Sequence, residues 1–202
     1  MLFLRKPDDR GFSLVELIVV ILIIGVLSTG TTFALSSVYH ADAERAAKKI
    51  CNLMATARAK AMADDGDLVN ITVKITQDAE GNNIAGIYRY EKNPESGVWD
   101  AGTLVEEAEK LSNYKVEVLI GPKNSGADDG SRKALGDDYS SIEYSFKKSS
   151  GGIDWVKTDG TIDKDDVTNV PIVYADIIVE GASTYKIIVV PATGRCNMSE
   201  GT

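Results

Sequence analysis

The chain has 202 residues, of which 44% are hydrophobic and 26% charged, a composition typical of a globular domain with room for an additional segment. Its formal net charge of -8 argues against a general nucleic-acid binder, because such proteins displace counterions from phosphates with clustered Lys and Arg. The one histidine, His40, argues against a histidine-based catalytic triad or a multi-histidine metal site. We therefore expect no enzyme activity and no cofactor.

The N-terminal forty residues begin with a short charged segment and continue as an apolar run. Three basic and two acidic side chains lie within residues 1–11, whereas residues 12–39 contain one charged side chain, Glu16. About 20 apolar residues can cross a bilayer as a helix, and preceding cations keep the N-terminus in the cytoplasm. We therefore predict a transmembrane helix over residues 12–39, with the following residues outside the cytoplasm.

Three interpretations of this segment compete. A secretory signal peptide cut near Ala41 and Ala43 has some support, but the apolar run is longer than the roughly 7–15 residues of such peptides. A plain membrane anchor leaves Glu16 unexplained, since a charge within a span costs about 2.5–3.5 kcal/mol on insertion scales. A leader cut before the apolar run would retain that run and give Glu16 a role.

A family resemblance supports the third interpretation, a leader cut before the apolar run. The sequence GFSLVEL over residues 11–17, followed by IVVILIIGVL, resembles the class III leader junction of type IV pilins and type II secretion pseudopilins. The resemblance implies that residues 1–11 are a leader peptide, that a prepilin peptidase cuts between Gly11 and Phe12, and that Phe12 is then N-methylated. It also implies that Glu16 pairs with the N-terminal amine of a neighbouring subunit and fixes subunit register during assembly.

The family resemblance further implies a structural protein of the inner membrane, later incorporated in an extracellular or periplasmic filament. Its expected partners are the prepilin peptidase, other pilin-like subunits, a membrane platform protein and an assembly ATPase. The residues do not say whether the filament serves surface pili, type II secretion or DNA uptake. Residues 57–61, 187–190 and 193–195 resemble H-type minor pseudopilins and fimbrial T proteins. The alternative is an exported binding module or small enzyme behind a signal peptide or single anchor.

Residues 40–65 are predicted to continue the helix in amphipathic form. Residues 41–63 contain no Pro or Gly and are rich in helix formers. Apolar side chains follow the i, i+3, i+4 spacing of one buried helix face. They lie at positions 43, 46, 47, 50, 53, 54, 57 and 61. Acidic residues and Gly66 are expected to end the helix.

Residues 66–202 are predicted to form a β-rich globular head. The apolar pattern alternates with period two, as in strands with one buried face. Predicted strands cover 69–75, 85–90, 114–120, 142–146, 173–179 and 185–190, with hairpin turns at 80–83 and 180–183 and a long polar loop at 121–138. The expected fold class is α+β, with the long N-terminal helix packed on an antiparallel sheet.

The two cysteines, Cys51 and Cys196, allow two interpretations. They are 145 positions apart and form no CxxC pair, which argues against zinc. Cys51 lies beside the apolar stripe of the helix and is interpretable as a small buried hydrophobic residue. A Cys51–Cys196 disulfide is the alternative, and it would fasten the C-terminus to the helix.

An acidic segment invites a calcium hypothesis. Asp159, Asp163 and Asp165 lie close together, and some pseudopilins bind calcium in loops of this region. Their spacing does not match the EF-hand loop, so we expect a solvated acidic turn and no metal site.

Overall fold

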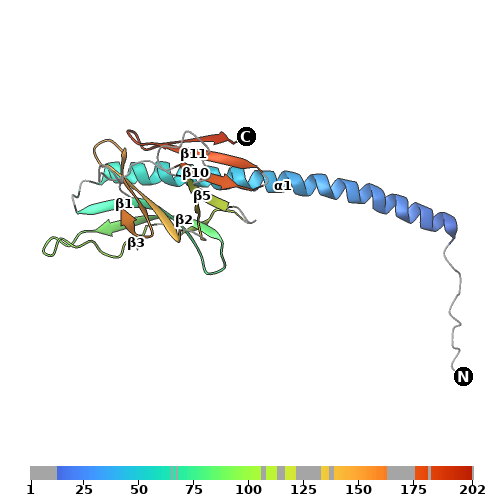
Figure 1. Cartoon of the computed structure of the whole chain (residues 1–202), viewed down its shortest axis with the longest axis horizontal. Helices are drawn as coiled ribbons and strands as arrows, with labels where there is room; N and C mark the ends of the chain where they lie inside the picture. Colours follow the sequence, from blue (N-terminus) through green and yellow to red (C-terminus); the bar gives the residue numbers. More distant parts are fainter. Residues whose placement is uncertain are drawn as a thin grey trace, which may run out of the picture. The chain divides into compact units, whose positions relative to one another are not determined.

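A computed structural model gives the structure of the chain (Figure 1). It describes residues 13–64, 66, 68–105, 108–112, 117–121, 133–136, 139–162, 176–181 and 183–201, with the backbone alone at 27–40, 117, 119–121, 133 and 176. The chain divides into two compact units, Met1–Val38 and Tyr39–Thr202, and each is considered by itself. We call the second of these the folded unit.

Helix α1 extends over Leu14–Ala63 and belongs to both units. In the first unit its described side chains are almost all apolar. In the described part of the chain, no helix is long and apolar enough to cross a membrane, so the predicted span over residues 12–39 is not confirmed.

In the folded unit, one face of α1 is buried, as the stripe predicts. Seven of its apolar side chains, mostly alanines, are at most 1% exposed: Ala43, Ala46, Ala47, Ile50, Met54, Ala57 and Ala61. Leu53, also predicted on this face, is partly buried. Alanine adds little bulk, so it lets the strands approach the helix closely. The helix ends at Ala63, and the carboxylate of Asp64 accepts a hydrogen bond from the backbone N–H of Gly66 (3.0 Å).

Among the described residues, the strands form two antiparallel sheets. The seven-stranded sheet has the order β3-β2-β1-β7-β8-β9, with β4 also paired to β2. Its strands are β1 (Val69–Gln77), β2 (Asn83–Glu91), β3 (Thr103–Leu104), β4 (Glu109–Lys110), β7 (Ser141–Phe146), β8 (Ile153–Thr158) and β9 (Thr161–Ile162). The five-stranded sheet has the order β12-β11-β10-β5-β6. Its strands are β5 (Glu117–Gly121), β6 (Lys133–Ala134), β10 (Asp176–Glu180), β11 (Thr184–Val190) and β12 (Arg195–Glu200).

Both sheets contribute alternate side chains to one core with the helix. In β1 the buried apolar residues are Val69, Ile71, Val73 and Ile75, and in β11 they are Ile187 and Val189. Cross-strand register aligns these positions with apolar partners, such as Val73 with Ile87 on β2 and Tyr144 on β7. Figure 1 shows the helix together with strands of both sheets.

The α+β class is confirmed, but the prediction of one sheet is wrong. Period-two alternation shows which side chains of a strand are buried, whereas strand partners depend on contacts distant in sequence. Here β5 pairs with β10, although more than fifty positions separate them in the chain. The alternation therefore could not show where one sheet ends and the other begins.

Individual elements agree with the predictions to different degrees. The hairpins β1–β2 and β10–β11 form at the predicted turns, closed by hydrogen bonds such as Gly81 N–H to Asp78 O (3.0 Å). Strands β8 and β12 were not predicted. The predicted loop 121–138 contains strand β6, and residues 114–116 and 173–175 of two predicted strands lie outside the described residues.

Candidate functional site

The predicted cleavage site, Gly11 and Phe12, lies outside the described residues, and the description begins at Ser13. The backbone N–H of Leu17 donates to the carbonyl of Ser13 (3.1 Å), the first hydrogen bond of α1. Ser13 is thus the N-cap residue and Glu16 the third helical residue. A carboxylate in the first turn interacts favourably with the positive end of the helix dipole, and the Glu16 side chain is exposed.

The same residues carry a signal that the sequence prediction did not use. Ser13-Leu14-Val15-Glu16 has the S-x-x-E pattern of a capping box, in which the two polar side chains satisfy N–H groups at the helix start. The pattern predicts a local role for Glu16 in starting the helix, besides the predicted role in subunit pairing, although the structure has no capping hydrogen bond between the described Ser13 and Glu16. The two roles are separable by experiment, because a capping box accepts Gln in place of Glu.

The start of α1 is apolar on every side. Eleven large apolar side chains of its described first part are each 46–75% exposed. They are Leu14, Val15, Leu17, Ile18, Val19, Val20, Ile21, Leu22, Ile23, Ile24 and Val26. A helix that is hydrophobic all round is stable when lipid or other protein segments surround it. This surface is therefore suited to contact with a bilayer or with other apolar helices.

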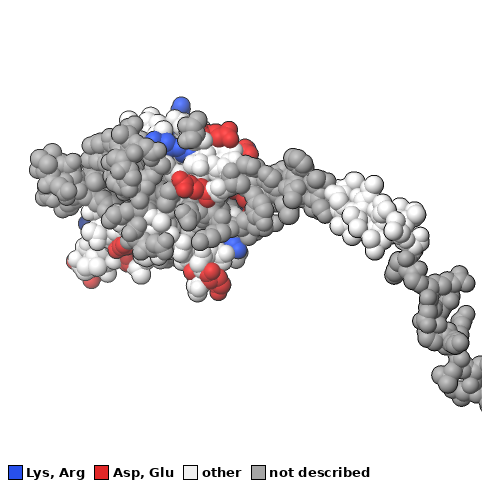
Figure 2. All heavy atoms as spheres, turned by 45° about the vertical axis from the view of Figure 1, so that its right-hand side comes forward, with Lys and Arg blue, Asp and Glu red and all other residues white. Residues whose placement is uncertain are grey.

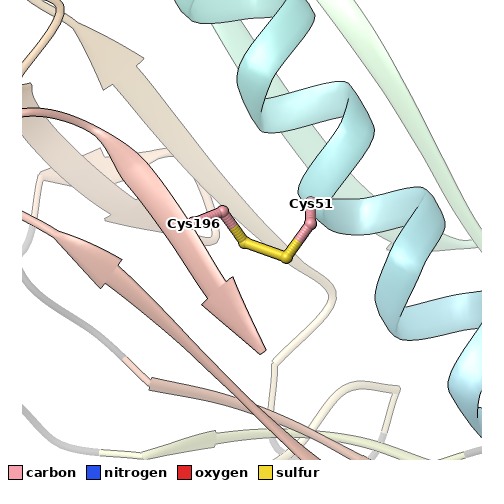
Figure 3. Close-up of a disulfide and its surroundings, with 2 residues drawn as sticks. All are labelled: Cys51 and Cys196. Atoms are coloured by element: carbon pink, nitrogen blue, oxygen red, sulfur yellow. A yellow bond between two sulfur atoms is a disulfide. The ribbon is translucent and has the colours of Figure 1, made fainter. Parts of the chain in front are cut away.

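Cys51 on α1 and Cys196 on β12 form a disulfide (Figure 3), with a Cα–Cα distance of 5.4 Å. Of the two interpretations of Cys51, the structure therefore agrees with the disulfide. Strand β12 is at the edge of the five-stranded sheet, so the bond fastens that edge and the C-terminal end of the chain to the helix. Both cysteines are partly buried against the core.

The predicted calcium residue Asp159 closes a turn. Asp159 and Gly160 connect β8 and β9 with φ angles of 49° and 77°, the left-handed conformation of a two-residue hairpin turn. The Asp159 carboxylate accepts hydrogen bonds from the hydroxyl and N–H of Ser140 (2.6 and 2.7 Å) and from the N–H of Ser141 (3.2 Å). The Asp-Gly pair was a hairpin signal in the sequence that the prediction missed.

Asp163 and Asp165 lie outside the described residues. Within the described ranges, no group of three or more His, Cys, Asp or Glu side chains could hold a metal ion. The hydrogen bond from the Ser140 hydroxyl, with support from the two N–H groups, lowers the pKa of Asp159. Its carboxylate thus has a structural use in holding the turn.

Residues 6–32 match the family model of the prokaryotic N-terminal methylation motif. This motif is the prepilin leader signature of type IV pilins and pseudopilins, and it implies processing by a prepilin peptidase. No curated protein and no solved structure matches the chain.

Loss of the disulfide should destabilise the folded unit. Replacing Cys51 and Cys196 by Ser opens a loop of 145 positions, and the chain-entropy model predicts a loss of about 3–5 kcal/mol in the free energy of unfolding. Urea unfolding of the purified oxidised chain, the reduced chain and the double variant measures this loss. The reduced wild type should match the double variant, and equal stability of all three forms would contradict a stabilising disulfide.

The Asp159 contacts predict a loss of stability in acid. Because the folded pKa is below the unfolded value, the carboxylate stabilises the fold above pH 4 or so, and this contribution is lost as the pH falls through the folded pKa. Asp159→Asn keeps a residue that tolerates the turn but removes the charge. Thermal unfolding is measured from pH 7 to pH 2. At pH 7 the variant should have a lower Tm than the wild type, and its Tm should fall less than that of the wild type as the pH decreases.

The control is Asp154→Asn, at an exposed aspartate on β8. It should follow the wild-type pH profile. An Asp159→Asn profile that coincides with the wild type at every pH would show that these hydrogen bonds do not stabilise the fold.

Proposed function

We propose that the chain is a structural subunit of a type IV pilus-like or type II secretion filament, assembled through its N-terminal helix. The observation that carries this proposal is the prepilin leader motif over residues 6–32, within which helix α1 begins with exposed apolar side chains on every side. A leader cut at Gly11 would leave those side chains on the mature protein. They would lie in the inner membrane before assembly and against neighbouring helices afterwards.

Each residue at the junction has a physical role in this proposal. Gly11 lacks a side chain, so an extended backbone can enter a protease cleft closely. Cleavage makes the nitrogen of Phe12 a free amine, which the prepilin peptidase then methylates. Glu16 follows about one helical turn later, and a carboxylate in apolar surroundings needs a cationic partner. The amine of a neighbouring subunit supplies it, so the pair sets the axial register.

The disulfide supports the proposed location of the folded unit. Disulfides persist in oxidising compartments and are rare in the cytoplasm. A bond between Cys51 and Cys196 fits a folded unit on the outer side of the inner membrane. The partners of this proposal are the prepilin peptidase, other pilin-like subunits, the platform protein and the assembly ATPase. The likeness to H-type pseudopilins stays a prediction.

Blocking the leader cut tests the proposal. Gly11→Val places a branched side chain at the cleavage site, so the precursor should keep its leader and stay in the membrane fraction. Gly25→Val is the matched control for leader cleavage, since it adds the same side chain away from the cleavage site and its Cβ meets no atom of the chain within 4 Å. Immunoblots of membranes and of sheared filaments measure both variants. Filaments containing uncut Gly11→Val chains at the wild-type level would contradict the proposal.

Two substitutions of Glu16 distinguish a role in subunit pairing from a role in helix capping. Glu16→Ala and Glu16→Gln should both leave cleavage intact and reduce filament yield by more than about tenfold, because an unpaired charge in apolar surroundings costs several kcal/mol. Gln retains the capping box but not the charge. Normal assembly of Glu16→Gln with failure of Glu16→Ala would assign Glu16 to capping, and normal assembly of both would refute the register role.

A further inference from the structure

One face of the seven-stranded sheet is turned away from the core, and we call it the outer face. Strand alternation puts Asn70, Thr72, Lys74, Tyr88, Tyr90, Glu143, Ser145, Trp155 and Lys157 on it. Of these, Thr72, Glu143 and Ser145 are at most 3% exposed, so the aromatic and lysine side chains form its accessible part. The register places Thr72 between Tyr88 and Ser145, and Lys74 opposite Glu143. Four strands thus bring aromatic rings and lysines together on one surface of the folded unit.

The carboxylate that the strand register puts on this face, Glu143, is hidden, whereas the exposed Asp100 lies near Tyr90 at its edge. Glu143 is 3% exposed, and its oxygens accept hydrogen bonds from the Tyr90 hydroxyl (3.1 and 3.2 Å) and lie 3.2 Å from the Lys74 ammonium. Burial, together with the charge of Glu143, raises the pKa of Tyr90, so the phenol keeps the proton that it donates. The negative charge is therefore compensated inside the sheet and does not face solvent.

The lysine ammonium groups lie over aromatic rings. The Lys157 Nζ is 4.1 Å from the centre of the Trp155 ring, and the Lys92 Nζ is 5.9 Å from the centre of the Trp99 ring. Such contacts hold an ammonium group in place. Within the part of the chain that the structure describes, neither lysine forms an ion pair, although the register places Lys157 opposite the buried Glu143. Either ammonium can pair with a carboxylate of another chain.

Exposed apolar residues lie beside Lys92. Lys92 lies between Leu68, whose carbonyl accepts its N–H (2.7 Å), and Trp99, with which it forms an isolated bridge. Leu68, Trp99, Val98 and Leu104 are all exposed. Aromatic anchors beside exposed apolar residues are typical of protein–protein interfaces. Because lysines lie over the rings, the ring faces are poorly placed to stack with bases or sugars.

Exposed carboxylates lie on other parts of the folded unit. The chain has a formal net charge of -8, and its partly or fully exposed carboxylates include Glu44, Glu80, Glu109, Glu180 and Glu200, none of them on the outer face. Figure 2 shows acidic side chains in several groups on the surface. Copies with this net charge repel each other unless unlike surfaces meet.

We propose that the outer face, with Lys92 and Lys157 at its surface, docks against an acidic surface of a second copy of this chain. This inference rests on the proposed filament. A contact between two different surfaces of identical chains is heterologous, and heterologous contacts can continue without closing, as a filament requires. The cationic face and the acidic surface of one chain supply these two unlike surfaces.

Cross-linking of wild-type filaments tests the proposal. A carbodiimide joins an ammonium directly to a touching carboxylate, so purified filaments should give a covalent dimer of this chain on a denaturing gel. Mass spectrometry of the dimer should find Lys92 or Lys157 joined to Asp or Glu. Links to a different protein, or dimers joined through other lysines alone, would overturn the proposal.

Charge reversal gives a second, independent measurement. Lys92→Glu with Lys157→Glu should reduce filament yield by at least about tenfold, because like charges would then meet at the contact. The control is Lys186→Glu, on strand β11 of the other sheet, which should leave the yield unchanged. Urea unfolding of each variant shows whether it folds. If the double variant is unstable, Lys92→Ala with Lys157→Ala replaces it, with a smaller expected loss of yield.

The outcomes distinguish this inference from the proposed function. Absence of any filament containing the wild-type chain would contradict the proposed function and, with it, the inference. Filaments that form normally with both lysines reversed would overturn the inference alone.

Discussion

An apolar helix surface that must be covered is the constraint on which the rest of the structure depends. The first part of α1 exposes large aliphatic side chains in every direction. About 25 cal/mol per Å² of apolar surface favours its removal from water, which makes lipid or other helices the stable surroundings. The charge of Glu16 sits at the start of this surface, where an amine or the helix N-terminus can compensate it.

In the folded unit, one face of the same helix is buried against strands of the chain itself. There the stripe from Ala43 to Ala61 is buried, and strands of two sheets contribute to its core. The disulfide adds a covalent link between Cys51 and the edge strand β12. The helix that begins with the apolar surface is thus fastened to strand β12 by packing and by one covalent bond.

Much of this arrangement could be predicted from local patterns. The i, i+3, i+4 spacing identified the buried face of α1, because helix geometry alone puts those positions together. The division into two sheets could not be predicted, since it depends on pairings such as β5 with β10. Strand β8 was missed because its alternation is weak, with Trp155 and Lys157 on the outer face and a register shift beside Phe146. The Glu143 contacts required the register of three strands.

The sequence predicts a cleavage site at Gly11 and Phe12, which lie outside the residues that the structure describes. The leader junction is a short linear motif, so it is readable without any fold, and the family model covers it. The disulfide was left as one of two alternatives, because a separation of 145 positions carries no distance information. Asp159 was assigned to a solvated turn or calcium loop, whereas its carboxylate binds Ser140 through hydrogen bonds that sequence spacing does not reveal.

The identity of the first residue of the mature protein tests the central claim most directly. Mass spectrometry of the chain purified from a host with a working prepilin peptidase should find N-methylated Phe12 at its start. A mature chain beginning at Glu44 would indicate signal-peptidase cleavage and loss of the apolar helix. That start, or an intact Met1, would contradict assignment of the chain as a pilin-like filament subunit.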